Sequence, residues 1–308
     1  MRKKGFFFTV AALLLLTLLL FAASLSGTSR LMEKTAVIDS RVASVNDFLK
    51  SSEQDIQRGV YISGFRAILS AESFISTNGM YLPNAQQNLE ELVINGTLNG
   101  TSQAFMNGST LIDWRNSLQQ QADKTDILFN ITVNQLSFSQ EDAWNVLITA
   151  NITLNVSDKR GAASWLVNKS IQAKVSIIGL EDPMYTVETG GTVIIAVNRT
   201  IYEGNYTSGT DVSNLLSHTY GYSFANSTGP SFLMRMQGNF SNSTYGIESL
   251  IDISRLQDQG MIIYDRSIVD YAYFSGMNTT NYRINGTPGW FKIDEQHLAK
   301  YQVSGLTS

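Results

Sequence analysis

Few residues of this 308-residue chain have the types and spacing that enzyme chemistry requires. The two histidines, His218 and His297, are far apart in the sequence and lack the neighbouring ligand pattern of a metal site. The chain has no cysteine, which excludes disulfides, thiolate metal sites and cysteine nucleophiles. Zinc-protease, nucleophile-elbow, phosphate-loop, dinucleotide-binding and EF-hand patterns do not occur. We therefore expect no catalytic residue, no cofactor and no metal, and a protein that is not an enzyme.

The acidic residues do not indicate an enzyme either. A glycosidase needs two carboxylates held a few ångströms apart, whereas Glu181 and Asp182 are adjacent and would face opposite sides of a strand. With Pro183 behind them, these residues are interpreted as a turn. The remaining candidate acids show no pairing pattern: Asp252, Asp258, Asp265 and Asp270. A membrane-tethered hydrolase is accordingly the least favoured function.

Charge and composition limit the partners. The formal net charge is −4, and Lys and Arg are scattered rather than clustered. Because phosphate backbones are bound by concentrated basic surfaces, nucleic acid is not an expected partner. A hydrophobic content of 43% allows a buried core. The absence of cysteine in an exported protein of this size favours a prokaryotic surface.

Asparagine carries the one strong chemical signal, which is N-glycosylation. Fourteen of the 23 asparagines lie in N-x-[ST] sequons, whereas random placement would give about 4. The last of them, Asn285, is the weakest because Pro288 follows it. The other thirteen are the candidate glycan acceptors: Asn95, Asn99, Asn107, Asn130, Asn151, Asn155, Asn168, Asn198, Asn205, Asn226, Asn239, Asn242 and Asn278.

Strands with two-residue periodicity are expected to position several of these asparagines. In 148–157, apolar and polar residues alternate, so Asn151 and Asn155 fall on the polar face. Residues 127–134 alternate in the same way and place Asn130 outward, and 170–177 supply a third strand. A more apolar run, 192–200, predicts a fourth. Turns near 139–142 and 158–161 favour an antiparallel meander from about 125 to 200.

The N-terminus predicts a membrane helix. Arg2, Lys3 and Lys4 precede an apolar run from Phe6 to Ala23 that is long enough to span a bilayer. The basic residues favour an inside N-terminus, which places the remainder outside the cell. A cleaved secretory signal has a shorter apolar region, and Ala22-Ala23-Ser24 is only a passable cleavage site, so we expect a retained helix.

The residues Lys4-Gly5-Phe6 resemble the class III, prepilin-type signal of archaeal surface proteins. In that family a peptidase cuts after the glycine, which implies Gly5 and Phe6 as the processing site and Phe6 as the mature N-terminus. The chain departs from the family at Val10, where many pilins have an acidic or polar residue, and this disfavours a major filament subunit. Segments beginning at Val175, Gly229 and Ser267 are similar to large archaeal proteins with pilin-type N-termini, a family with no established activity. An uncleaved anchor remains the alternative.

Behind this segment, residues 28–77 predict a long helix with one apolar stripe. Turn residues at Asn78-Gly79 and Leu82-Pro83 are expected to end it. The stripe comprises Leu31, Ile38, Val42, Val45, Leu49 and Ile56. It could form the stem typical of pilin-like proteins, or it could simply pack on its own domain.

Residues 201–308 are rich in aromatic, Gly and Ser residues and predict a smaller α+β region. Within it, 232–239 and 260–267 indicate strands, 246–260 indicates either a short helix or a strand joined to a helix, and 294–303 indicates a helix. The aromatic side chains most simply pack a core, although an aromatic surface can also bind a sugar or a protein.

The expected fold is thus α+β, with an N-terminal transmembrane and stalk helix, an antiparallel β-rich head and a smaller α+β part. The expected divisions are 1–27, 28–124, 125–200 and 201–308. We expect a non-enzymatic cell-surface glycoprotein, a minor pilin or adhesin-like subunit that is anchored in the membrane or associated with a pilus. Its partners would be the membrane, N-linked glycans and other pilin-like subunits. The alternative is a signal-anchored binding or envelope protein that does not polymerise.

Overall fold

The computed structural model describes the backbone of residues 2–308 and the side chains of 6–25 and 32–308. The fold is α+β, and the chain divides into two compact units. The first unit comprises the chain up to Asp55, Asn116–Thr132 and Thr153–Asn168. The second comprises Ile56–Arg115, Val133–Ile152 and Lys169–Ser308.

The elements follow one another in this order: α1 (Arg2–Asn78), α2 (Ala85–Asn95), β1 (Thr97–Leu98), β2 (Thr101–Ser102), the 3₁₀ helix η1 (Ala104–Met106), α3 (Leu111–Asp123), β3 (Ile127–Asp142), β4 (Asn145–Asp158), β5 (Ser164–Ser176), α4 (Pro183–Glu188), β6 (Asn198–Arg199), α5 (Ser213–Tyr220), β7 (Ser223–Ser227), α6 (Phe232–Met236), β8 (Gly246–Glu248), α7 (Ile253–Asp258), α8 (Asp270–Ser275), β9 (Asn281–Arg283) and β10 (Lys292–Asp294).

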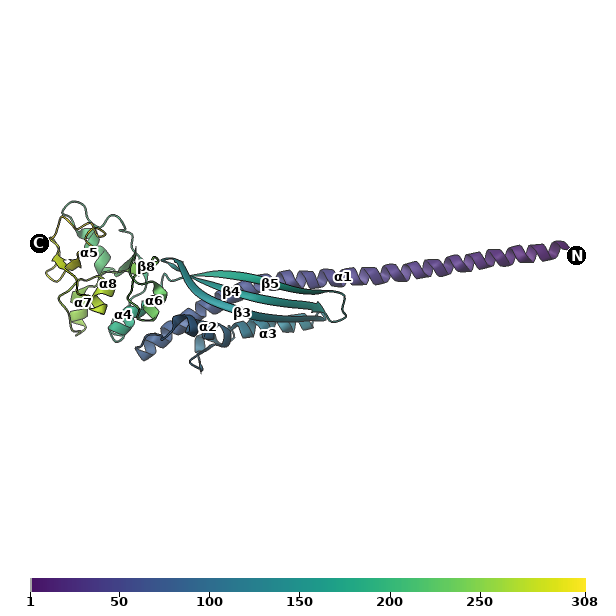
Figure 1. Ribbon diagram of the computed structural model, residues 1–308, viewed down its shortest axis with the longest axis horizontal. Helices are drawn as coiled ribbons and strands as arrows, with labels where there is room; N and C mark the ends of the chain where they lie inside the picture. The colour runs from purple at the N-terminus through teal and green to yellow at the C-terminus, as the bar shows by residue number, and fades with distance from the viewer. Residues whose placement is uncertain (1) are drawn as a thin grey trace. The chain divides into compact units, whose positions relative to one another are not determined.

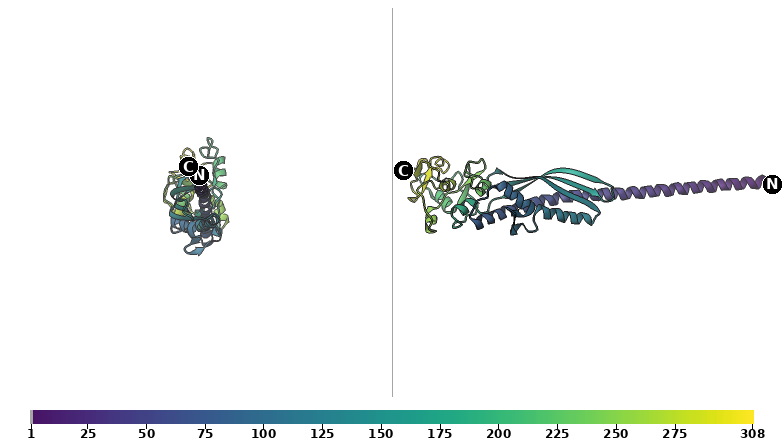
Figure 2. Two further views of the ribbon diagram at one scale, coloured as in Figure 1. Left: turned by 90° about the vertical axis from the view of Figure 1, so that its right-hand side faces the viewer. Right: turned by 60° about the horizontal axis from the view of Figure 1, so that its bottom comes forward.

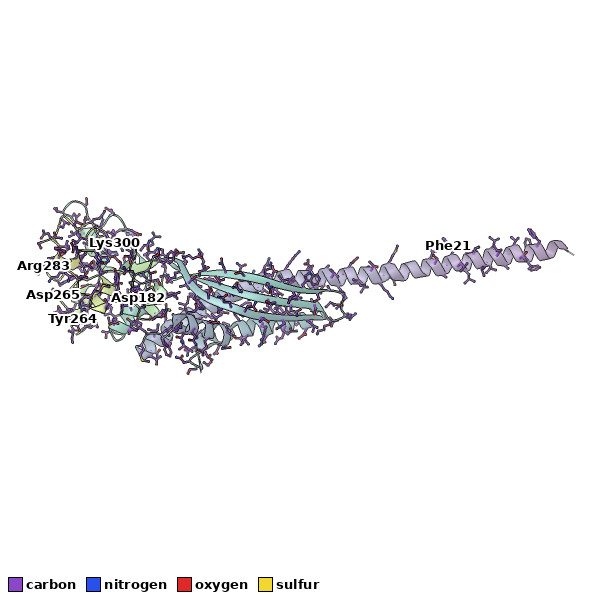
Figure 3. The ribbon with its side chains drawn as sticks, in the orientation of Figure 1. Phe21, Asp182, Tyr264, Asp265, Arg283 and Lys300 are labelled. Atoms are coloured by element: carbon purple, nitrogen blue, oxygen red, sulfur yellow. The ribbon has the colours of Figure 1, made fainter. Side chains whose placement is uncertain are left out.

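Helix α1 is a single helix of 77 residues (Figure 1). Its first part, Phe6–Leu25, is long and apolar enough to cross a membrane, and none of it is buried within the chain. Phe21, for example, has 67% of its surface exposed (Figure 3). The helix ends as predicted, because Gly79 adopts the left-handed conformation and its N–H bonds the carbonyl of Ile75.

The later part of α1 is buried on one face. Of the predicted stripe, Val45, Leu49 and Ile56 are buried and Ile38 is exposed, while Leu31 lies outside the described side chains. In the first unit Phe48 packs edge-on against Phe129 of β3. The apolar stripe of α1 therefore packs against other parts of the chain from about residue 42 onward.

The two internal glycines of α1 permit close packing. A Cβ at Gly64 would lie 1.9 Å from Cδ1 of Ile148 in β4, and a Cβ at Gly59 would lie 3.0 Å from the ring of Trp114. Both glycines stand in unbroken helix. They allow a neighbouring side chain to approach the helix backbone, and this contact offsets their low helix propensity.

Strands β3, β4 and β5 form one sheet in that order and lie side by side in both views (Figures 1 and 2). Short connections require consecutive strands to be antiparallel. The predicted alternation in β4 is confirmed, since Ile148, Ile152 and Val156 are buried while Asn155 is exposed. The first turn lies two residues later than predicted, at 143–144, where the Asp142 carboxylate accepts the N–H of Trp144.

The predicted fourth strand is wrong. Within 192–200 only Asn198–Arg199 is a strand, β6, which pairs in parallel with β7 in a different sheet. That sheet has the order β6-β7-β8, with β7 and β8 antiparallel. The apolar run is buried at Val193, Ile195 and Val197 because it packs in the core. The run also pairs locally, because Ala196 forms an isolated antiparallel bridge with Glu181 instead of joining the β3-β4-β5 sheet.

Three further assignments in the C-terminal region differ from the sequence predictions. Residues 232–236 form helix α6 instead of a strand, 261–264 have no regular structure, and 295–302 form turns instead of a helix. Apolar runs this short fit a buried helix as well as a strand. Of the two alternatives for 246–260, the structure shows the strand joined to a helix, as β8 and α7.

Candidate functional site

A cleft of about 530 Å³ lies in the second unit, and its ionisable wall comes from three distant parts of that unit. Glu248 is the last residue of β8, where it pairs with Ala225 of β7. Tyr271 belongs to α8, and His297 and Lys300 come from the turns after β10. Lys300 is labelled in Figure 3.

His297 is held between two carboxylates. Its Nδ1 lies 2.6 Å from Asp294 Oδ1, and its Nε2 lies 3.4 Å from Glu248 Oε2 and 3.0 Å from the hydroxyl of Tyr271. Burial alone would lower the pKa of His297, but the hydrogen bond to Asp294 and the negative charges of Glu248 and Asp294 outweigh it and raise the pKa to about 9. The ring is therefore an imidazolium at neutral pH.

Glu248 is the matching anion. Its Oε1 accepts hydrogen bonds from the Lys300 ammonium at 2.7 Å and from the Tyr301 hydroxyl at 2.8 Å. Burial favours a protonated carboxyl, yet His297 and Lys300 hold the pKa of Glu248 down at about 2. The ion-paired groups that border the cleft therefore keep their charges across the physiological pH range.

This arrangement suits binding better than proton transfer. A general acid needs a raised carboxyl pKa and a general base needs a free imidazole nitrogen, and Glu248 and His297 meet neither condition. Ser267 donates to Asp294 Oδ2 and has no bond to the ring of His297, so these residues do not form a nucleophile–base pair. Among the described side chains, those of 6–25 and 32–308, no group of three His, Cys, Asp or Glu residues could hold a metal ion.

A second charged cluster is entirely buried and structural. Arg235 of α6 donates through Nη1 to Asp182 Oδ2 at 2.6 Å and through Nη2 to Asp270 Oδ2 at 3.0 Å. All three side chains are fully buried. Asp182 also caps α4 by accepting the N–H groups of Met184 and Tyr185. This cluster ties α4, α6 and α8 together.

From the sequence alone, His297 is an ordinary polar residue and Asp182 is a turn residue. The Asp294–His297 spacing of three residues was a local signal for a carboxylate–imidazole pair. Asp182-Pro183 was a signal for a helix N-cap with proline in the first turn, as α4 shows. The turn interpretation is therefore corrected to a helix start. No sequence pattern links either pair to Glu248 or Arg235.

The other acids and the second histidine have separate roles. Asp252 caps α7, and Asp265 pairs with Lys292 at 2.6 Å. His218 is buried, with Nδ1 3.0 Å from the Thr200 hydroxyl. Burial lowers the pKa of His218 to about 4, so this ring is neutral at physiological pH.

The predicted glycan acceptors are almost all at the surface. Twelve of the thirteen asparagines are exposed. Asn151 is half-buried, and its side-chain amide donates to Gln135 at 3.2 Å. Gly5 and Phe6 lie in α1, with Phe6 exposed.

Comparisons with known protein families, with curated proteins and with solved structures find no match for this chain.

The pairing of His297 predicts a pH-dependent stability. Because its folded pKa is raised above 6.5, the stabilisation is complete below pH 6.5 and is lost as the pH rises through 9. We expect His297→Gln to lower the free energy of unfolding by on the order of 2 kcal/mol at pH 6.5. The charge-linked part of this difference should disappear by pH 10 and leave only the cost of lost packing and hydrogen bonds, as measured by denaturant unfolding at both pH values.

His218→Gln is the matched control for this experiment. Its pKa of about 4 means that His218 loses no charge in the folded protein between pH 6.5 and 10. In the unfolded chain His218 is half protonated at pH 6.5, so the cost of this substitution should be about 0.4 kcal/mol smaller at pH 6.5 than at pH 10, a small change of opposite sign. An equal cost of His297→Gln at pH 6.5 and pH 10 would contradict the ion-pair assignment.

Proposed function

We propose that this protein is a non-enzymatic, membrane-anchored surface protein of the pilin-like type, a minor pilin or adhesin-like subunit. Its N-terminal helix would hold it in the membrane or in a filament, with the N-terminus inside the cell. The portion after Gly27 would be extracellular and N-glycosylated. No chemical reaction is assigned to it.

The observation that carries this proposal is the exposure of Phe6–Leu25. This 20-residue segment has a mean hydropathy of 2.7 and no part of it is buried within the chain. A helix of this length matches the roughly 30 Å hydrocarbon core of a bilayer. Apolar side chains such as Leu14 and Leu18 therefore need an apolar environment from outside the chain, which a membrane or neighbouring helices would provide.

The continuity of α1 supports the pilin-like version. The helix that begins in the apolar segment extends to Asn78, and its later residues are part of the protein core. Val45 and Val60, for example, are buried. An anchor that is continuous with a core helix is what a pilin-type subunit requires, and Lys4-Gly5-Phe6 fits the processing signal of such proteins.

The alternative is a signal-anchored binding or envelope protein that does not polymerise. Val10 favours it, because many pilins have an acidic or polar residue at that place. The cleft at Glu248 fits both versions, since a binding site serves a protein that acts singly as well as one in a filament.

Cleavage after Gly5 distinguishes the pilin-like protein from the signal-anchored protein that does not polymerise. We expect intact-mass analysis of protein extracted from native membranes to show a mature chain that begins at Phe6. A Gly5→Val variant should keep its first five residues, because the signal requires glycine before the cut. Wild-type protein that retains Met1 or Arg2 would contradict the pilin-like version and leave the plain anchor.

Glycosylation is tested separately by mass spectrometry of glycopeptides from the native protein. We expect glycans on Asn130 and Asn155, which are exposed on their strands. Asn151 should be modified less, because it is half-buried and bonded to Gln135. Unmodified asparagine at all three positions would refute this part of the proposal.

A further inference from the structure

Two buried polar atoms at the cleft have no hydrogen-bond partner among the described residues. They are Oε2 of Glu248 and the hydroxyl of Tyr206, and both side chains line the cleft. Glu248 Oε2 does form an ion pair with His297 Nε2 at 3.4 Å, but that nitrogen lies closer to the Tyr271 hydroxyl, at 3.0 Å. An unpaired buried hydroxyl such as that of Tyr206 costs about 1–3 kcal/mol. A ligand with hydroxyl groups could satisfy both.

The charges of the cleft lining balance. Its ionisable acids and bases are Glu203 and Glu248 on one side and His297 and Lys300 on the other. Lys300 and Glu248 are paired at 2.7 Å, and Glu203 is paired with Arg199 at 3.4 Å. A ligand with a net charge would therefore gain little, and an uncharged polar ligand fits this lining best.

The rest of the lining is rich in amide and hydroxyl groups. Asn226, Ser227 and Thr228 contribute one edge, and Asn242 and Thr244 contribute another. These short side chains both donate and accept hydrogen bonds. The side chains of Tyr206 and Tyr271 also line the cleft, although both rings are almost wholly buried.

We propose that this cleft is a saccharide-binding site that takes one or two neutral hexose units. Sugar hydroxyls would donate to Glu248 Oε2 and pair with the Tyr206 hydroxyl, while the amide and hydroxyl lining would fix the orientation. Because both atoms are covered in the free protein, the sugar would have to displace a side chain of the lining, such as that of exposed Gln296.

The saccharide could come from either of two sources. The lining includes residues of three sequons, those of Asn205, Asn226 and Asn242. A glycan on one of these asparagines could occupy the cleft of its own chain. A glycan on another molecule could also bind there, which would give the protein an adhesive contact. The chemistry of recognition is the same in both cases.

The test uses the full chain in detergent, produced in a host without N-glycosylation. The probes are maltose, lactose, cellobiose and chitobiose, and binding is followed by saturation-transfer NMR and titration calorimetry. We expect at least one probe to bind at a single site. Absence of binding by all four probes, with the protein folded, would overturn the proposal.

Tyr206→Phe is the decisive variant, because it removes an unpartnered hydroxyl and should leave the thermal unfolding midpoint unchanged or higher. We expect it to weaken sugar binding roughly tenfold, the equivalent of one well-placed hydrogen bond. Tyr222→Phe is the matched control, since its hydroxyl is also buried and unpartnered but does not line the cleft. Equal binding by the two variants would overturn the proposal.

Glu248→Gln should weaken binding by tenfold or more, although it also breaks ion pairs and its stability must be measured in parallel.

The source of the sugar is decided with protein from native membranes. If the chain's own glycan fills the cleft, wild type will not bind the probe, whereas a variant with Asn205→Gln, Asn226→Gln and Asn242→Gln will. If the sugar belongs to another molecule, both will bind. Failure of the unglycosylated protein to bind contradicts the cleft proposal alone, because membrane anchoring and processing at Gly5 are measured independently.

Discussion

Replacing Arg235 with methionine is expected to lower the free energy of unfolding by about 3–5 kcal/mol. The guanidinium is fully buried and is the cation that pairs with both Asp182 and Asp270, which are fully buried as well. Methionine fills similar space but leaves two carboxylates in a low-dielectric interior. Denaturant unfolding of the full chain in detergent, followed by tryptophan fluorescence and far-UV circular dichroism, measures the loss.

Arg160→Met provides the comparison for this measurement. Arg160 pairs with Asp126 at 3.2 Å, but its side chain is 68% exposed. Exposed ion pairs contribute about 0–1 kcal/mol, so this variant should resemble wild type. If Arg235→Met costs no more than Arg160→Met, the buried cluster is not the stabilising centre that its geometry indicates.

Gly246→Ala is expected to cost about 1–3 kcal/mol or more. A Cβ at this position would lie 1.8 Å from the carbonyl oxygen of Gly229 and 2.6 Å from its carbonyl carbon. Both atoms belong to the backbone, so no side-chain rotation relieves the clash. Gly229 is itself confined, because a Cβ there would lie 2.6 Å from the ring of Tyr271. The two loops must therefore separate.

The same substitution should also impair sugar binding. Asn226 and Thr228 precede Gly229 on one loop, Asn242 and Thr244 precede Gly246 on the other, and all four line the cleft. Separating these loops would displace both edges of the cleft. Gly305→Ala is the control, because no atom lies within 4 Å of its added Cβ and its φ is not in the left-handed region. A Gly246→Ala variant as stable as Gly305→Ala would contradict the close approach.

The local sequence pattern was sufficient to predict the long helix and the long strands. The length of the apolar run and the absence of proline before Pro83 indicate α1, and strict alternation indicates β4 with Ile152 inward and Asn155 outward. These signals work because a helix or strand repeats its geometry every few residues, so many residues report the same element. The excess of sequons is equally a property of sequence alone, and the glycosylation that it predicts awaits measurement.

The short elements of the C-terminal region depended on tertiary contacts. In 232–236 five residues form helix α6, and Arg235 of this helix pairs with Asp182 and Asp270. Residues 295–302 form turns that bring His297 and Lys300 to Glu248. In such segments the periodicity is too short to separate helix from strand, and the contacts of a few side chains decide.

The sequence by itself therefore determined the apolar helix, the alternating strands and the positions of the sequons, because each is a repeating or local pattern. Only the tertiary structure decided which charges are buried together and where the cleft lies. Asp182 and Arg235 are 53 positions apart, and Tyr301 and Glu248 are equally distant along the chain. Pairs at such separations follow from how the whole chain packs, and the composition of neither segment specifies its partner.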